Sequence, residues 1–339
     1  MKKKICSIIA GLVLCSALAG CGADGATQTD ATQSGSESTE NNGAATLNIA
    51  YQYGSAYAPL AIAMDKKFIE DEYKQATGQD VNITWTQMTK GADINTGIAS
   101  GQLDAGFLGT APAVTGCLKG VGYKIFTNLS GQKHAMYTNN SDIAGLKDLV
   151  GSNNQIALVN NGSIQHIILA MSLVENGMDP HALDSNIVAM SHPDGMVALQ
   201  SGSVACHLTT SPYIYTESED DTLTEIAEIS STWSVENSFI VGVAAEGLYN
   251  DDQKLYDALC KGIEDSINFV NENPEEAAKI TCVVNGTSEQ DELFYLQNGN
   301  YSPQTTNLLN IATFMVENGF VDSDSVAMDQ LVFQNVVGN

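Results

Sequence analysis

The 339-residue chain contains no arginine, since all 14 of its basic residues are lysines, and it carries 40 acidic residues. Arginine is the planar, two-pronged donor that proteins most often use to hold carboxylate, sulfonate or phosphate groups. Any anion bound by this chain must therefore be held by lysine, hydroxyl or backbone N–H groups. The formal net charge of −26 argues against a nucleic-acid partner, because such a surface repels phosphates.

The spacing of the cysteines and histidines does not indicate a metal site. The seven cysteines include no CxxC pair, and the five histidines form no i,i+4 pair or tract. A closed zinc site needs three or four converging ligands, so we expect no metal and no other cofactor. Four cysteines in the body of the chain can form up to two disulfides or remain buried free thiols; they are Cys117, Cys206, Cys260 and Cys282.

Motifs of the common catalytic sites are also missing. The chain has no GxSxG nucleophile elbow, no phosphate-binding P-loop and no HExxH metalloprotease motif. We therefore do not expect an enzyme.

The apolar run at the start of the chain is too short to span a membrane. Lys2, Lys3 and Lys4 precede a mostly apolar stretch over residues 5–18, followed by small residues, which is the pattern of an export signal. The ending LAGC at residues 18–21 resembles the lipobox of bacterial lipoproteins, which implies cleavage before Cys21 and a lipid on its sulfur. The alternative is an ordinary secretory signal that happens to contain a cysteine.

The sequence thus predicts an extracytoplasmic protein that is lipid-anchored to the bacterial cell membrane. Residues 1–20 form the signal peptide, whose removal takes three lysines and moves the formal charge from −26 to about −29. Residues 21–45 form a lipidated, disordered tether, because positions 22–45 hold no large apolar side chain. Some 24 such residues span about 25–30 Å on average.

The remaining residues, 46–339, alternate between strand and helix patterns and repeat themselves once. The strand pattern at 47–50, with Tyr53-Gly54-Ser55 and a helix behind it, returns at 156–159 with Asn161-Gly162-Ser163. The helix, turn and strand over 98–105, which lead into GTAP at 109–112, return over 199–205 before TTSP at 209–212. This order predicts an α/β fold with two lobes of similar topology.

Four strand-to-helix loops are the candidate binding elements, at residues 53–57, 109–112, 162–166 and 210–213. Ligands of open α/β sheets collect at the carboxyl ends of the strands, where the first N–H groups of each helix are unpaired. Such loops favour a small polar or anionic ligand. Alternatively, Ser55, Thr110, Ser163 and Ser211 only cap their helices.

Four segments resemble the nitrate/sulfonate/taurine-type substrate-binding proteins of ABC importers: YGSAYAPLAIAMDKKF, GIASGQLDAGFLGTAPAV, VNNGSIQHIILAMSLVENG and ALQSGSVACHLTTSPYIY. The resemblance covers residues 46–339 and implies a type II periplasmic-binding-protein fold, the two-lobed Venus flytrap with a cleft between the lobes. Residues 46–137 plus 240–339 would form lobe 1, and residues 138–239 lobe 2. The partners implied are a small solute and a membrane permease with its ATPase, and the protein itself would be a monomer.

The resemblance also implies which positions line the cleft. They are Tyr53, Gly54, Ser55, Tyr57, Gly109, Thr110, Ala111, Gly162, Ser163, Gln165, Ser211, Pro212, Tyr213 and, at the rim, Trp233. We expect a small anion such as a sulfonate or nitrate, held by helix N-termini. A neutral planar heterocycle related to the thiamine pyrimidine and held by tyrosines is the alternative, followed by a metal-binding lipoprotein.

The C-terminal third is predicted to be helical. Apolar residues at 255, 259, 263, 267 and 270 fall on one helical face, and Asn273-Pro274 is typical of the start of a second helix. Ser302-Pro303 predicts the start of a further helix.

Overall fold

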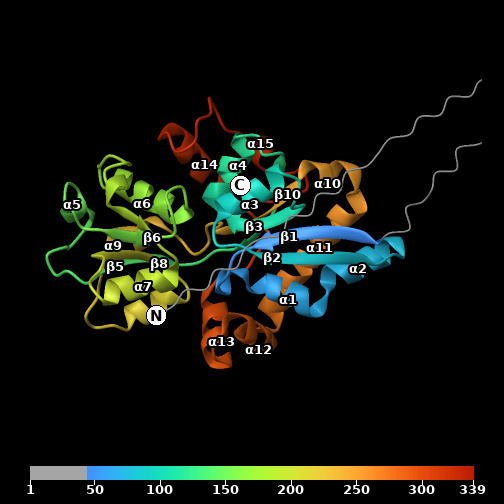
Figure 1. The fold of residues 1–339 in the computed structure, drawn as a ribbon, viewed down its shortest axis with the longest axis horizontal. Helices are drawn as coiled ribbons and strands as arrows, with labels where there is room; N and C mark the ends of the chain where they lie inside the picture. The colour runs from blue at the N-terminus through green and yellow to red at the C-terminus, as the bar shows by residue number, and fades with distance from the viewer. Residues whose placement is uncertain (1–43) are drawn as a thin grey trace, which may run out of the picture. The chain divides into compact units, whose positions relative to one another are not determined.

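The computed structural model describes residues 44–339, so the predictions for the signal sequence, Cys21 and most of the tether lie outside the described residues. The described chain contains two mixed five-stranded sheets (Figure 1). Both sheets combine parallel strands with antiparallel ones, and helices cover them.

The first sheet has the strand order β2-β1-β3-β10-β4. Strand β1 is parallel to β2 and β3, whereas β10 runs antiparallel to both β3 and β4. Its strands are β1 (Ala45–Tyr51), β2 (Val81–Gln87), β3 (Ala105–Gly109), β4 (Tyr123–Ser130) and β10 (Ile240–Ala245). The edge strand β2 alternates between buried and more exposed residues at its start, whereas β3 is buried throughout, as expected for a strand covered on both faces.

The second sheet repeats this arrangement with the order β7-β6-β8-β5-β9. Strand β6 is parallel to β7 and β8, and β5 is antiparallel to β8 and β9. Its strands are β5 (His134–Thr138), β6 (Ile156–Leu158), β7 (Ile187–Ala189), β8 (Cys206–Thr210) and β9 (Thr224–Glu225). The predicted internal repeat is therefore present, with β1 and β6 as equivalent strands.

The chain crosses between the two sheets twice. β5 follows β4 of the first sheet after three residues, and β10 returns to the first sheet after β9. The division into lobes at residues 137/138 and 239/240 stays a prediction; by its pairing, β5 belongs to the second sheet from His134 onward.

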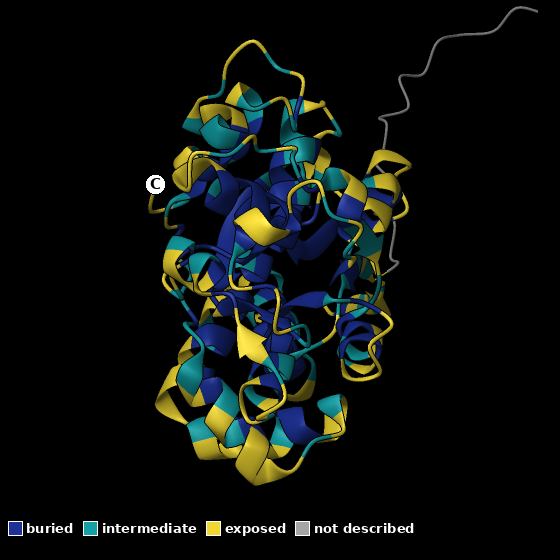
Figure 2. Cartoon of the chain, turned by 90° about the vertical axis from the view of Figure 1, so that its left-hand side faces the viewer, coloured by how far each residue is buried: buried dark blue, intermediate teal, exposed yellow. Residues whose placement is uncertain are grey.

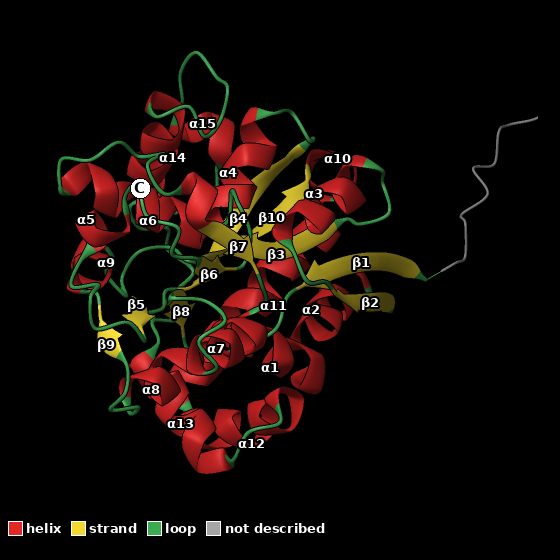
Figure 3. Cartoon of the chain, turned by 60° about the vertical axis from the view of Figure 1, so that its left-hand side comes forward, coloured by secondary structure: helices red, strands yellow, loops and turns green. Residues whose placement is uncertain are grey.

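Helices flank both sheets (Figure 3). The longer ones are α1 (Ala58–Lys66), α2 (Phe68–Thr77), α3 (Gly91–Ala99), α4 (Thr110–Leu118), α6 (Ile164–Glu175), α7 (His192–Gln200), α11 (Gln253–Glu272), α12 (Pro274–Asn285), α13 (Glu289–Asn298) and α14 (Leu308–Glu317). The short ones are η1 (Ser55–Tyr57), α5 (Leu146–Leu149), η2 (Asp184–Asn186), α8 (Tyr213–Ser218), α9 (Ala227–Thr232), α10 (Glu246–Asp251) and α15 (Met328–Leu331).

Burial follows the strands and the inner faces of these helices (Figure 2). On α11 the predicted apolar face is confirmed, since Leu255, Leu259, Ile263, Ile267 and Val270 are all buried. Asp252 caps this helix by accepting a hydrogen bond from the Leu255 N–H. Among residues 44–339, no helix combines the length and the apolarity that a membrane span requires.

The predicted helix start at Ser302-Pro303 is wrong, because α14 begins only at Leu308. The backbone of this segment is used by the first sheet instead. The Asn128 side chain donates to the Ser302 carbonyl, and the Asn128 N–H donates to the Pro303 carbonyl. These tertiary contacts outweigh the local signal of a serine followed by proline.

Candidate functional site

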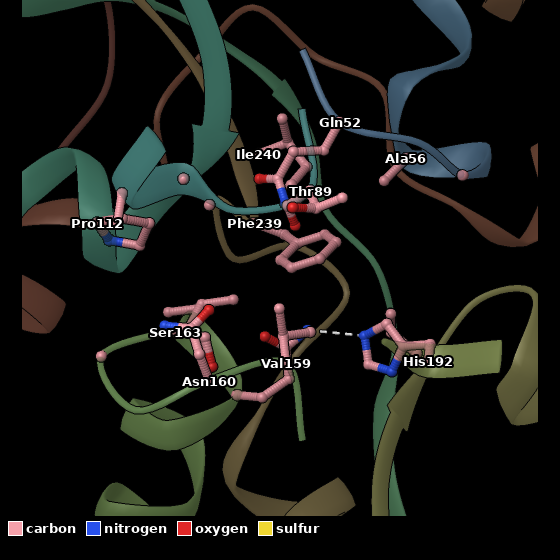
Figure 4. Close-up of a pocket in the computed structure, with 18 of the residues that line it drawn as sticks. Gln52, Ala56, Thr89, Pro112, Val159, Asn160, Ser163, His192, Phe239 and Ile240 are labelled. Carbon is pink, nitrogen blue, oxygen red and sulfur yellow. Dashed lines mark hydrogen bonds between the residues drawn. The ribbon is translucent and has the colours of Figure 1, made fainter. Parts of the chain in front are cut away.

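A cavity of about 250 Å³ lies where the strand-to-helix loops of the two sheets face each other. Figure 4 shows Pro112, Phe239 and Ile240 on one side of it, and Ser163, Val159 and His192 on the other. Its lining comes from the carboxyl ends of β1, β3, β6 and β8, the edge at which α/β sheets bind ligands. The volume suits a small solute.

Four predicted residues from the first sheet line this cavity: Tyr53, Gly54, Tyr57 and Gly109. Gly54 has φ 112°, which a side chain would strain, so the turn after β1 requires glycine. The Tyr57 hydroxyl donates to Gln52 Oε1 over 3.2 Å, which fixes this ring against the wall.

Five predicted residues from the second sheet line the opposite wall: Gly162, Ser163, Gln165, Ser211 and Tyr213. Ser163 caps α6 by accepting a hydrogen bond from the His166 N–H at 3.3 Å. Ser211 is 5% exposed, and its hydroxyl has no partner within residues 44–339. A buried hydroxyl without a partner is a free hydrogen-bonding group at the cavity.

The other five predicted residues do not line the cavity. Ser55 and Ala111 are buried behind the lining, and Pro212 lies between two residues that do line it. The Thr110 hydroxyl donates to the Ser238 carbonyl at 2.6 Å, so it holds α4 to the chain entering β10. Trp233, expected at the rim, is 4% exposed and donates from Nε1 to the Gln132 carbonyl at 3.1 Å, outside the lining of this cavity.

The lining contains no lysine, aspartate or glutamate. Its titratable groups are tyrosines and His192. Burial raises the pKa of Tyr213 to about 12 and lowers the pKa of His192 to about 3, so both are neutral at pH 7. The cavity is therefore uncharged and offers hydrogen bonds and ring faces in place of ion pairs.

Four helices of nine or more residues begin at this cavity. Gly109 and Ser163 are the N-caps of α4 and α6, and Gly91 and His192 are the first residues of α3 and α7. All four residues line the cavity. Helix N-termini carry unpaired N–H groups and a partial positive charge, which favour negatively charged or electron-rich ligand atoms.

A chain of buried polar side chains leads from the cavity wall into the second sheet. Gln165 Nε2 lies 3.3 Å from His192 Nε2, a contact marked by the dashed line in Figure 4, and 3.4 Å from His134 Nε2. His192 Nδ1 lies 3.2 Å from His207 Nε2, and His207 Nδ1 lies 2.5 Å from Glu217 Oε1. At the other end, His134 Nδ1 lies 3.1 Å from the Gln132 carbonyl.

Reasoning from the sequence missed several residues of the lining. They include Thr89, Gly91, Asn95, Asn160, His192, Phe239 and Phe320. The internal repeat singles out only β1 and β3 in the first sheet and β6 and β8 in the second, so it gives no signal for the loops after β2 and β7. Asn160 and Asn161 directly precede Gly162, so the repeated loop could have indicated them as lining residues.

The remaining histidines and the four cysteines between residues 44 and 339 show no metal-binding cluster. Within residues 44–339, no group of three or more His, Cys, Asp or Glu residues converges as metal ligands would. His166 accepts from the Gly162 N–H through Nδ1, and its Nε2 lies 2.8 Å from Asp184 Oδ1, so both ring nitrogens are used. Cys117, Cys206, Cys260 and Cys282 are free thiols.

Comparison with protein families matches residues 40–285, more than half of the chain, to the NMT1-like family. No curated protein sequence matches the chain.

Solved structures share the fold at low identity. The alkanesulfonate-binding protein of Xanthomonas axonopodis pv. citri, bound to MOPS, has a TM-score of 0.69 and 14% identity, covering 85% of this chain and 98% of that one. The periplasmic aliphatic sulphonate binding protein of Escherichia coli has a TM-score of 0.66 and 17% identity, covering 86% of this chain and 93% of that one. The periplasmic nitrate-binding protein of Synechocystis PCC 6803 has a TM-score of 0.63 and 14% identity, covering 85% of this chain and 84% of that one. The predicted two-lobed periplasmic-binding-protein fold is confirmed.

Proposed function

The chain belongs to the NMT1-like family, and from this premise we propose that it is an extracytoplasmic solute-binding protein of an ABC importer. The observation that carries the proposal is the cavity itself. Loops at the carboxyl ends of strands from both sheets line it together, so one small solute touches both lobes at once.

Capture then works by a shift in population. A solute that contacts both lobes only when they are together binds the closed form more tightly than the open one, and so it favours closure. The crossover segments, which lead into β5 and β10, are the candidate hinges. A permease that recognises the closed form would receive loaded protein in preference to empty protein.

We propose a small anion, such as a sulfonate or nitrate, as the solute. The four helix N-termini at the cavity favour negative charge without any arginine or lysine. Structural neighbours named for sulfonate and nitrate binding support this choice. In the uncharged lining no carboxylate opposes an anion.

A neutral planar heterocycle is the second candidate, because the lining offers ring faces. Tyr213 stacks on His192 with ring centroids 5.9 Å apart and an interplanar angle of 26°. Tyr53 and Tyr57 lie on the opposite wall. Aromatic faces that border a cavity favour a flat ring between them.

Thermal shift of the domain that starts at residue 44, measured against matched panels, tests the role and separates the two classes. We expect sulfonates or nitrate to raise the Tm by several degrees and calorimetry to give one site per chain. Stabilisation by pyrimidines alone would select the second class. If no member of either panel stabilised the domain, the role of solute binding would be refuted for both classes.

We further propose that the lipid on Cys21 holds the protein beside its permease and the partner ATPase, and that the protein acts as a monomer. The lysine-rich start and the LAGC ending at residues 18–21 support the anchor. The long polar segment after Cys21 supports a tether that leaves the binding domain free to reach the permease.

A further inference from the structure

The side chain of Gln165 has a fixed role for each of its amide atoms. Gln165 is 3% exposed, and its Nε2 faces the Nε2 atoms of two histidines, His134 and His192. A neutral imidazole nitrogen either donates or accepts, depending on the tautomer. Whether each of these nitrogens donates or accepts follows from the groups at the two ends of the buried series of side chains, the Gln132 carbonyl and Glu217.

The end at Gln132 fixes the tautomer of His134. A backbone carbonyl can only accept, so the His134 Nδ1 that lies 3.1 Å from the Gln132 carbonyl must carry a proton. Burial lowers the pKa of His134 to about 3, so its ring is neutral and its Nε2 has a lone pair. The Gln165 amide must then direct N–H, and not its oxygen, at His134.

The hydrogen bonds from Gln165 to Glu217 follow in the same donor-to-acceptor direction. The second Gln165 N–H points at His192 Nε2, which therefore accepts, and His192 Nδ1 donates to His207 Nε2. His207 Nδ1 then donates to Glu217 Oε1. A protonated Glu217 could start the reverse direction by donating to His207 Nδ1. That direction fails at Gln165, because it sets a His192 N–H against the Gln165 N–H, or the Gln165 oxygen against the lone pair that the Gln132 carbonyl fixes on His134.

With both amide hydrogens used, the Gln165 oxygen remains. Within residues 44–339 it has no hydrogen-bond partner, and it is not among the fully buried atoms without a partner. Since Gln165 lines the cavity, this accessible oxygen faces the solute. The wall at this point is an acceptor that cannot turn into a donor.

We infer that Gln165 is a specificity-determining residue, oriented by the buried chain from the Gln132 carbonyl to Glu217, and that the solute must present an N–H or O–H group to its Oε1. The inference rests on the proposed solute-binding role. It deepens that role by one requirement, which disfavours nitrate because nitrate has acceptors only. A sulfonate that binds well carries a hydroxyl or amino group, and a heterocycle that binds well carries an exocyclic amine. A solute with acceptors only would leave the buried Gln165 oxygen unpaired and facing another acceptor.

The tautomers test this orientation without any solute. In the ¹⁵N spectrum of histidine-labelled protein at neutral pH, we expect His134, His192 and His207 as Nδ1–H tautomers, each assigned by a single substitution. His166 is the internal control: it accepts through Nδ1 and should therefore be the Nε2–H tautomer. An Nε2–H tautomer at His134 or His192 would overturn the inference.

Two isosteric pairs of probes test the specificity. They are 2-hydroxyethanesulfonate against 1-propanesulfonate, and 4-amino-2-methylpyrimidine against 2,4-dimethylpyrimidine. In whichever pair binds, we expect the member with the donor to bind about tenfold more tightly. Gln165→Leu should remove most of this ratio.

Gln200→Leu is the matched control, the same change at a residue that does not line the cavity. Gln200 is the exposed last residue of α7, so its loss should leave the ratio unchanged. Equal binding of both members of a pair by the wild type would overturn the inference even with the expected tautomers. If neither pair bound, the proposed solute classes would fail, and the tautomers alone would then decide how Gln165 is oriented.

Discussion

A single glycine, Gly131, marks a close approach between the two segments that cross from one sheet to the other. Gly131 lies between β4 and β5, at the first crossover between the sheets. A Cβ built there would lie 2.0 Å from the Val235 carbonyl oxygen and 2.8 Å from that of Asn237. Both obstacles are backbone atoms, which cannot rotate away.

Gly131→Ala should therefore destabilise the fold by about 1–3 kcal/mol, the usual cost of forcing an atom into packed structure. Chemical denaturation measures this change. Gly120→Ala is a surface comparison with a different cause: nothing lies within 4 Å of its added Cβ, but its φ of 69° favours glycine. A Gly131→Ala variant as stable as the wild type would contradict the close approach.

Residues in the candidate site differ in how well the sequence could predict them. Gly54, Gly162 and Ser163 follow from the repeated loops, because turn glycines and helix caps are local signals. The buried histidines carry no such signal. His134, Gln165, His192 and His207 come from β5, α6, α7 and β8, and only the folded sheet brings them together.

Among the elements, α6 connects stability to the candidate site most directly. Its N-cap, Ser163, lines the cavity and satisfies the His166 N–H at the same time. Ser288 caps α13 in the same way, by accepting from the Asp291 N–H at 3.1 Å, and it does not line the cavity.

Ser163→Ala and Ser288→Ala should each lower the free energy of unfolding by about 1 kcal/mol. Only Ser163→Ala should also weaken the binding of the best solute found by thermal shift. Parallel denaturation and calorimetry of the two variants check both statements. Equal affinities in the two variants would mean that the start of α6 does not contact the solute.

Secondary structure followed local signals except where tertiary contacts took over the backbone. The helix α11 and the start of α12 were predictable from the sequence. One amphipathic face indicated α11, and Pro274 indicated the start of α12. Residues 302–307 were not predictable. Their backbone bonds with Asn128 and Ser238 instead of forming a helix, and no local pattern reports a partner more than 60 residues away.

At the scale of the whole molecule, the buried chain makes stability depend on pH. Burial lowers the pKa of His134, His192 and His207 from 6.5 to about 3 and raises that of Glu217 from 4.5 to about 8. Below about pH 6.5 the unfolded chain binds more protons at these histidines, so stability falls as the pH falls. Between about pH 4.5 and 8 the folded chain holds a proton on Glu217 that the unfolded chain has lost, so this group lowers stability as the pH rises.

These groups together predict a maximum of stability near pH 6.5. Glu217→Gln should flatten the decline above this pH, which amounts to at most about 1.4 kcal/mol per pH unit, and should leave the decline on the acid side. Thermal unfolding from pH 4 to 9 of both proteins gives the difference curve. A difference that does not change between pH 5 and 8 would show that Glu217 does not keep its proton when buried.

Attachment to the membrane through Cys21 is a prediction about residues that precede the described region. Cys21→Ala should release the protein into the soluble fraction and leave its affinity for solute unchanged, because the residues that line the cavity begin only at Gln52. Fractionation and calorimetry measure the two effects. Lost affinity, or retention in the membrane, would mean that the role of Cys21 has been misread.

The position of β10 constrains the order in which the chain can fold. The second sheet uses only residues between 134 and 225, so all of its strands are available once that stretch has emerged from the ribosome. The first sheet still lacks a strand at that point, because β10, at residues 240–245, lies between β3 and β4. A nascent chain of 239 residues therefore contains every strand of one sheet, whereas the other sheet is split into two pieces, with the apolar edges of β3 and β4 waiting for the same late strand.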